Sequence, residues 1–269
     1  MHRNSQGVPT LNQQYFSKLM RAVVEFQMID AHDRILIGLS GGKDSVFLTY
    51  ALAVLQQRFK KPFELGALTI DPKFSEDFPV ERLAKFCAEL HVPFEAIAVD
   101  INGIIEKEPK NSPCFTCAFF RRGAVNRYAK EHGYNKVAYA HHNDDAVETL
   151  LMSMLFSGQI QTFAPKTYLN RKELTVIRPL IFFREQETRA AISMHGFTPI
   201  PSPCPHDGKT KRQQVKEIIA RWEQDIPQSY AHLASAMRQN AVGELWPAAK
   251  TRKEMVETYR AYMYPQTEN

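Results

Sequence analysis

Apolar residues recur along this chain with two different spacings. Where they lie three to four positions apart they predict amphipathic helices, and short unbroken apolar runs between these helices predict buried strands. The predicted helices are 16–28, 46–59, 79–90, 114–132 and a segment that reaches Phe156, and the predicted strands are 34–39, 64–70, 94–99 and 136–140. Strands that alternate with helices are typical of a Rossmann-like parallel sheet with helices on both faces, an α/β fold.

The pattern becomes less regular after Phe156. One more strand is predicted at 175–180 and one more helix at 184–195. Four prolines between Pro199 and Pro205 indicate a rigid extended segment, and the remainder has helical spacing. We therefore divide the chain into an N-terminal helical extension (1–30), an α/β core (31–200) and a C-terminal helical region (201–269).

Composition and charge narrow the class of protein without naming a function. The 269 residues are 44% hydrophobic and 23% charged, which excludes a disordered, collagen-like or coiled-coil chain. A net charge of +5 is compatible with a nucleotide or RNA partner. The first ten residues are polar, and no apolar run approaches the roughly 20 residues that cross a bilayer. We expect a cytoplasmic protein with no membrane contact and with reduced thiols.

A glycine-containing turn joins the predicted strand 34–39 to the following helix. It reads Ser40-Gly41-Gly42-Lys43-Asp44-Ser45. Glycines allow the backbone to approach a polyphosphate, the amides of a helix N-terminus donate to its oxygens, and Lys43 adds positive charge. The spacing is that of neither the Walker loop nor the dinucleotide-binding loop. The alternative is a tight turn whose serine caps the helix.

Two further polar turns follow predicted strands and so are expected at the same edge of the sheet, where α/β proteins bind ligands. One begins at Asp71, and the other contains His141, His142, Asp144 and Asp145. Carboxylates at this edge can hold Mg²⁺ paired with nucleotide phosphates, and we assign Asp145 to the metal and His141 and Asp144 to the nucleotide. The alternatives are a zinc site on the two histidines and a helix cap at Asp144.

The four cysteines are too few for a disulfide scaffold at this length. Cys114 and Cys117 open a predicted helix, whose N-terminus favours thiolates, and Cys204 lies in the proline-rich segment. Three thiolates can hold zinc with His206 as a fourth ligand, or three irons of a [4Fe-4S] cluster whose fourth iron stays open. A redox dithiol and two helix-packing cysteines are the alternatives. Cys87, on the apolar side of its helix, is predicted to be a core residue.

Arginines follow the cysteine pair on the same predicted helix. Arg121 lies four residues after Cys117, on the cysteine face, where its charge can stabilise a developing negative charge. Arg122 can bind RNA phosphate. A second group of basic residues follows the prolines and, together with Arg121, Arg122 and Arg127, can form either a phosphate-binding face or a solvated helix surface. That group consists of Lys209, Lys211, Arg212, Lys216 and Arg221.

These motifs together resemble those of a known family. SGGKDS after an apolar strand resembles the pyrophosphate loop of the N-type ATP pyrophosphatases. Followed by CFTCAFFRRG and a lone downstream cysteine, it resembles the tRNA 2-thiocytidine biosynthesis family. The resemblance runs from Phe16 to about Ala236 and includes VVEFQMI, HHNDDAVETL and VIRPL.

The resemblance implies a transferase that takes part in tRNA processing. ATP would adenylate the C2 oxygen of a cytidine in the tRNA anticodon loop, and a [4Fe-4S] cluster would deliver the sulfur that replaces it. Cys114, Cys117 and Cys204 would be the cluster ligands, and Asp145 would be catalytic. We add Lys43 and Arg121 to the catalytic set, and assign residues 40–45 and Asp71 to ATP binding.

Two segments depart from the family pattern. Pro205-His206-Asp207 stands where relatives often have a second cysteine pair, which favours an open iron, and the segment from Ser157 to Gln161 is less basic than usual. Expected partners are tRNA and a sulfur donor, either a cysteine desulfurase or free sulfide. A homodimer is among the assemblies that the sequence allows. The alternatives are thiolation of another RNA base or of a small molecule, and a non-catalytic nucleotide-binding iron–sulfur or zinc protein.

Overall fold

Six strands form one sheet, in the order β3-β2-β1-β4-β6-β5. The computed structural model describes residues 9–75, 78–107, 112–195, 197–201, 210–238 and 251–263. The strands are β1 (Arg34–Gly38), β2 (Glu64–Asp71), β3 (Phe94–Ala98), β4 (Lys136–Ala138), β5 (Lys166–Leu169) and β6 (Leu174–Ile177). The first four and β6 run parallel, as predicted, and their carboxyl ends meet at one edge of the sheet.

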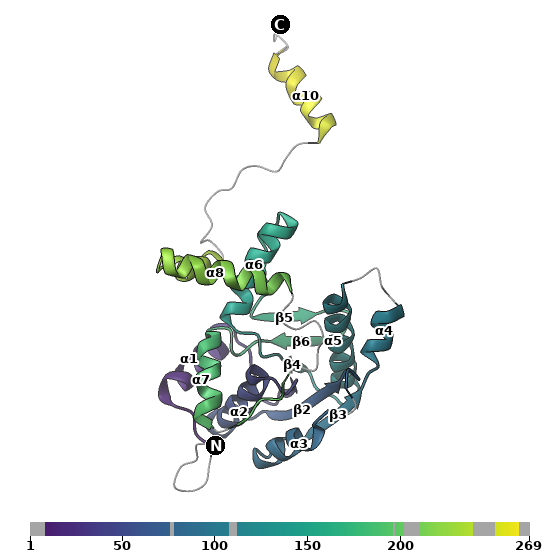
Figure 1. Ribbon diagram of the computed structural model, residues 1–269, viewed down its shortest axis with the longest axis vertical. Coiled ribbons are helices and arrows are strands. Elements are labelled where there is room, and N and C mark those ends of the chain that lie inside the picture. Colours follow the sequence, from purple (N-terminus) through teal and green to yellow (C-terminus); the bar gives the residue numbers. More distant parts are fainter. Residues whose placement is uncertain are drawn as a thin grey trace.

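Helices cover both faces of this sheet (Figure 1). Side chains alternate along β1, so that Ile35 and Ile37 enter one apolar core while Leu36 enters the other. The first core holds α1 (Gln13–Glu25), α2 (Lys43–Arg58), α3 (Val80–Glu89) and α7 (Glu185–His195), and the second holds α5 (Pro113–Glu131). None of the described helices is long and apolar enough to cross a lipid bilayer. The predicted sandwich of helix, sheet and helix layers is confirmed.

The helix that follows the glycine turn is buried along most of its length. Eleven consecutive residues of α2, from Ser45 to Leu55, are buried, so this helix forms the centre of the first core. Its Phe47 contacts the rings of Tyr15 and Phe183 edge to face, at centroid distances of 5.9 and 5.4 Å. This aromatic group fixes α1 and the segment before α7 against α2, and so holds the glycine turn in place.

Two elements were missed by the sequence pattern. Helix α4 (Ile101–Lys107) is short, and β5 pairs antiparallel with β6 at the edge of an otherwise parallel sheet. Both are too short to show a clear period. The β5 strand is only partly buried, so it lacks the continuous apolar run that identified the central strands.

Two C-terminal helices pack on α6 (Asn143–Ser157). One apolar cluster joins α6 to α8 (Lys211–Asp225) and α9 (Ser229–Ala236). It consists of Val147 and Leu151 of α6, Val215 and Ile219 of α8, and Tyr230 of α9. Helix α10 (Arg252–Met263) is the last described element. The division of the chain into three parts stays a prediction.

We expect Phe47→Ala to lower the free energy of unfolding by about 3–5 kcal/mol, because it removes a fully buried ring and leaves a cavity. Urea unfolding followed by circular dichroism measures this change. Val24→Ala, at an apolar position that is 62% exposed, is the control and should change stability by less than about 0.5 kcal/mol. Equal stability of the wild-type and Phe47→Ala proteins would contradict the packing described here.

Candidate active site

The turn Ser40–Ser45 lies between β1 and α2, at the carboxyl edge of the sheet. Gly42 is the N-cap of α2 and makes no side-chain cap hydrogen bond. The Ser45 hydroxyl donates to the Gly42 carbonyl (2.9 Å) and accepts from the Ser40 backbone N–H (3.2 Å), which holds the turn in shape. A helix N-terminus in this arrangement is suited to an anion.

Gly41 needs to be glycine for two reasons. Its φ of +84° is a backbone conformation that favours glycine, and a Cβ at this position would lie 2.8 Å from Cδ1 of Ile200. The Ile200 backbone N–H also donates to the Gly41 carbonyl (2.9 Å). The segment 197–201 is therefore fastened directly to the turn, although more than 150 residues separate them.

The Lys43 ammonium forms two ion pairs with carboxylates. Its Nζ lies 2.7 Å from Asp44 and 3.0 Å from Glu185 of α7. Burial lowers the pKa of Lys43, but the two carboxylates outweigh it and the net shift is upward, so the side chain carries its charge. Asp44 in turn accepts a hydrogen bond from the Thr188 hydroxyl (2.5 Å).

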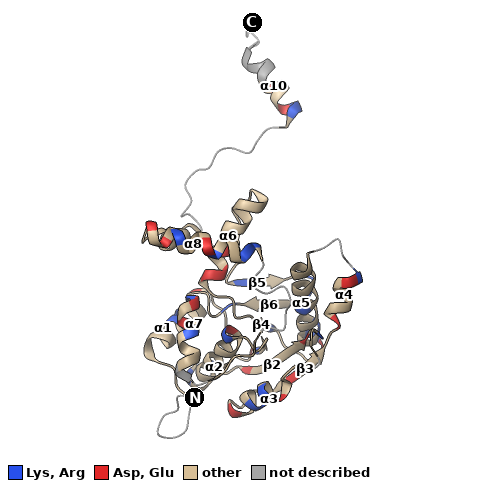
Figure 2. Ribbon diagram, viewed as in Figure 1, with Lys and Arg blue, Asp and Glu red and all other residues tan. Residues whose placement is uncertain are grey.

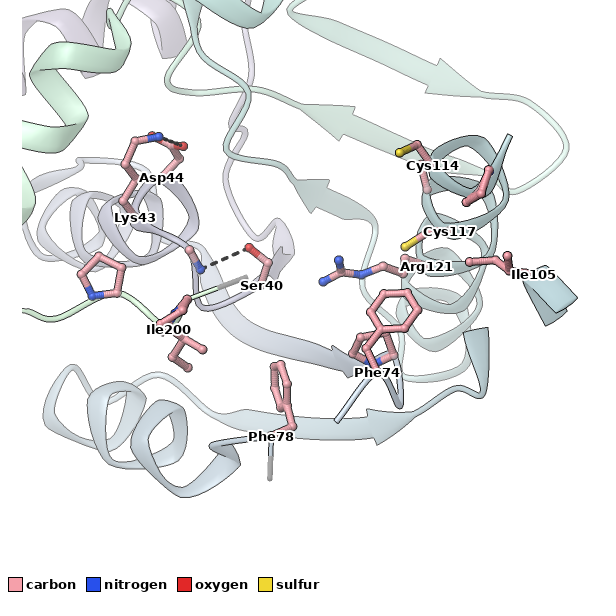
Figure 3. A pocket seen from close by; sticks show the side chains of 16 residues that line it. Ser40, Lys43, Asp44, Phe74, Phe78, Ile105, Cys114, Cys117, Arg121 and Ile200 are labelled. Atoms are coloured by element: carbon pink, nitrogen blue, oxygen red, sulfur yellow. Dashed lines mark hydrogen bonds and ion pairs between the residues drawn. The ribbon is translucent and has the colours of Figure 1, made fainter. Parts of the chain in front are cut away.

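A cavity of about 610 Å³ opens beside the turn and is lined on its other side by α5 (Figure 3). Cys114, Cys117 and Arg121 lie on the α5 wall, and Arg121 reaches toward Ser40 (Figure 3). Ser112 caps α5 by accepting from the Phe115 N–H (3.4 Å), which fixes where the helix begins. The predicted common face of the two cysteines and Arg121 is confirmed.

The rest of this cavity is mostly apolar. The other lining residues are Pro72, Phe74, Phe78, Ile105, Pro113, Ala118, Pro199, Ile200 and Pro201. Apolar walls exclude water and strengthen electrostatic interactions within the cavity. Cys204 and His206 lie outside the described residues, but Pro201, three positions before Cys204, lines the same cavity as the cysteine pair.

A smaller cavity of about 330 Å³ continues from the same turn toward β4. It shares Ser40, Asp44 and Arg121 with the larger cavity and adds His141 and Asp145. Burial lowers the pKa of His141 to about 4, so the imidazole is neutral at pH 7. Its Nδ1 is buried without a hydrogen-bond partner among the described residues.

The neighbouring residues of the carboxylate turn have structural partners. His142, not Asp144, caps α6: its side chain accepts from the Asp145 N–H, and the Asp145 carboxylate accepts from the His142 N–H (2.9 Å). Asp144 accepts from Arg184 Nε (2.9 Å) and from the Glu185 N–H (2.7 Å) and lines neither cavity. Asp144 therefore ties α6 to the start of α7.

Asp71, which begins the third polar turn, also lines neither of these two cavities. It is buried at the end of β2, where it accepts from the Lys73 backbone N–H (2.9 Å) and pairs with the Lys73 ammonium (2.8 Å). It shapes the turn that places Pro72 and Phe74 in the larger cavity. Among the described residues, no three His, Cys, Asp or Glu side chains gather into a metal-binding group.

A chain of ion pairs joins Asp145 to Lys43 through α8. Arg212 bridges Asp145 (3.4 Å) and Glu148 (2.7 Å), and Lys216 bridges Glu148 (3.7 Å) and Glu185 (2.9 Å). Glu148 is only 2% exposed, and its burial raises its pKa, while the hydrogen bond from Arg212 opposes that rise. Glu185 completes the chain through its contact with Lys43.

This network corrects one expectation from the sequence. Arg212 and Lys216 were expected on either a phosphate-binding face or a solvated helix surface, but their charged ends pair with Glu148, Asp145 and Glu185. Glu148 was missed although it lies in the quoted HHNDDAVETL motif, three residues after Asp145 and so on the same side of the helix. Glu185, distant in sequence from the glycine turn, carried no signal of its own.

The chain is similar in sequence to known proteins. Residues 11–222 match the PP-loop domain family ATP_bind_3. The chain is 34% identical to a tRNA-cytidine(32) 2-sulfurtransferase from Dichelobacter nodosus, over 84% of this chain and 85% of that one. It is 33% identical to another from Stenotrophomonas maltophilia, over 86% and 78% of the two chains.

A solved structure has a similar fold. It is the U34-tRNA thiolase NcsA from Methanococcus maripaludis with its [4Fe-4S] cluster, with a TM-score of 0.69 and 21% identity over 88% of this chain and 83% of that one. At this identity the similarity concerns the fold.

The Glu185 ion pairs predict a specific pH dependence of stability. Burial alone would raise the pKa of Glu185, but Lys216 and Lys43 outweigh it and bring the pKa from 4.5 to about 2. The folded state therefore binds the proton less readily than the unfolded state. Stability from these pairs is present above pH 4.5 and is lost as the pH falls toward about 2. Glu185→Gln should be less stable than wild type at neutral pH, and this difference should shrink across that window.

Urea unfolding of both proteins at a series of pH values measures the difference. Glu64→Gln is the control, because Glu64 forms an exposed pair with Arg34 and its removal should have little effect at any pH. A stability difference between wild type and Glu185→Gln that stays constant from pH 7 to pH 2 would contradict the assignment.

Proposed function

Because the chain belongs to the PP-loop family that includes the tRNA-cytidine(32) 2-sulfurtransferases, we propose that it thiolates a cytidine of tRNA at the expense of ATP. The target would be the C2 oxygen of cytidine 32 in the anticodon loop. The observation that carries the proposal is the shared cavity: the anion-binding turn and the cysteine pair face each other across one space.

The turn Ser40–Ser45 and the first turn of α2 would bind the phosphates of ATP. The phosphate oxygens would accept from backbone N–H groups and take over Lys43 from Glu185, which keeps its second partner Lys216. The cytidine C2 oxygen attacks the α-phosphorus, the bond to the β-phosphate breaks, and pyrophosphate leaves. Neutral His141 can donate or accept one hydrogen bond beside the reacting groups without adding charge.

Mg²⁺ belongs to this proposal as the partner of the ATP phosphates. A magnesium ion typically uses one or two carboxylates and takes its other ligands from phosphate and water. Asp145 lines the smaller cavity beside the turn, and we assign it as the protein oxygen ligand.

The cysteine wall suits an iron–sulfur cluster held by three thiolates. Cys114 and Cys117 border the cavity at the start of α5. Cys204 follows Pro201 by three residues, and a stretch of that length spans at most about 10 Å, so the sequence separation allows a third thiolate to join the same site. When bound, such a cluster supplies an open iron site that can bind and orient sulfide.

The second half-reaction exchanges oxygen for sulfur. Sulfide, either free in solution or released from the persulfide of a cysteine desulfurase by a thiol reductant, forms a bond to C2, the bond from C2 to the adenylated oxygen breaks, and AMP leaves. Arg121 borders both cavities, between the turn and the cysteine pair, so its guanidinium can stabilise the negative charge that develops on this oxygen. The apolar walls keep water from competing with sulfide.

Nucleoside mass spectrometry of tRNA tests the proposal directly. A strain that lacks this protein should contain no 2-thiocytidine, and the wild-type gene should restore it. Asp145→Asn should not restore it, because the neutral amide lacks the charge assigned to the metal. Asp225→Asn, an exposed position at the end of α8, is the matched control and should restore it fully.

Normal 2-thiocytidine in the deletion strain would overturn the proposed function. Restoration of 2-thiocytidine by Asp145→Asn would overturn the role of that residue. ATP hydrolysis without any thiolated nucleoside would favour a nucleotide-binding module of another kind.

A further inference from the structure

Two phenylalanine rings stand in solvent next to the cysteine pair. Phe115 is 59% exposed and Phe119 is 57% exposed, and both lie on α5 one helical turn apart. Their rings are nearly parallel, with centroids 6.2 Å apart and an interplanar angle of 19°. A third ring, Phe120, supports Phe119 edge to face at 5.4 Å. The pair thus presents flat π-faces that no described part of the chain covers.

These rings border the proposed reaction site. Phe115 lies between Cys114 and Cys117 in sequence, and Phe119 lies between Cys117 and Arg121. Because successive residues of a helix are rotated by about 100°, the two rings form a stripe next to the cysteine and arginine stripe that lines the cavity.

The charge on this helix indicates the chemistry of its partner. Arg122 and Arg127 are exposed on α5, and the only acidic residue of this helix is Glu131, at its last position (Figure 2). Arg122 uses Nε to donate to the Ala118 carbonyl (3.0 Å) and lines the smaller cavity, so its guanidinium lies between the exposed rings and that cavity in the order of residues around the helix. Aromatic faces interleaved with arginines suit unpaired nucleotides, whose bases stack and whose phosphates pair with guanidinium groups.

We propose that Phe115 and Phe119, with Arg122, form a stacking surface for unpaired nucleotides that flank the reacting base. The inference rests on the proposed function and adds to it the part of the surface that holds the RNA loop open. Stacking on these rings would compensate for the loss of base stacking within the loop when the target base leaves it and enters the cavity. The arginine would hold the phosphate next to the stacked base.

Binding of a labelled tRNA anticodon stem–loop to the anaerobically purified holoenzyme tests this inference. Phe115→Ala and Phe119→Ala should each raise Kd by roughly 5- to 150-fold, the range expected for one lost base–aromatic contact. Phe115→Leu and Phe119→Leu should weaken binding almost as much, because leucine keeps the apolar area but lacks the π-face. Tyr168→Ala removes an equally exposed ring on β5 and is the control, with unchanged Kd.

A second set of RNAs tests stacking itself. Each RNA of this set lacks one base of the loop. For the RNA that lacks the base stacked on Phe119, Phe119→Ala should cause no further loss of affinity, because the stacking contact is already absent. If every such RNA shows the full penalty, or if the alanine variants bind the intact stem–loop like wild type, the inference fails.

Sedimentation of the same variants distinguishes a surface between two copies of the chain. A change from dimer to monomer in Phe115→Ala or Phe119→Ala, with leucine variants that remain dimeric, would overturn the inference in favour of that interface. Failure of the proposed function is distinguishable, because it appears as normal 2-thiocytidine in the deletion strain whatever the stem–loop affinities are.

Discussion

The balance of charge at the carboxyl edge of the sheet is the constraint on which the site depends. Lys43 faces the place that an anion would occupy, and in its absence Asp44 and Glu185 hold this ammonium. Glu185 also pairs with Lys216, and Lys216 with Glu148, so each of these three residues has at least two oppositely charged partners. Phosphate binding can therefore replace one carboxylate at Lys43 while the displaced group keeps a partner. The same pairs fasten α8 to α6 and α7.

The turn Ser40–Ser45 also brings segments that are distant in sequence to one cavity. The Ile200 N–H donates to the Gly41 carbonyl, and the Ile200 side chain occupies the space that a Cβ on Gly41 would fill. This contact fixes the segment before Cys204 to the turn Ser40–Ser45, the proposed phosphate site. Helix α5 supplies the opposite wall with Cys114 and Cys117. Two half-reactions that must share one base are thereby confined to one space.

How much of this could be predicted from the sequence depended on the kind of signal. The central strands and long helices were predictable because burial on both faces leaves continuous apolar runs, as in β1 and α2. The short α4 and the edge strand β5 lack such runs and were missed. Residues 40–45, Cys114, Cys117 and Arg121 were predictable because their chemistry lies in local motifs. The pairing of Arg212 with Glu148 was not, because it joins residues 64 positions apart and depends on how α8 packs.

The central claim is that one wall of the cavity activates the base and the other provides the sulfur. Exchange of labelled pyrophosphate into ATP in the presence of tRNA, measured on Cys114→Ser and Cys117→Ser variants, separates the two. We predict that tRNA-dependent exchange persists in both variants while formation of 2-thiocytidine is lost, because only the sulfur-delivering wall has changed. Loss of exchange together with thiolation, or thiolation that survives the removal of either cysteine, would contradict it.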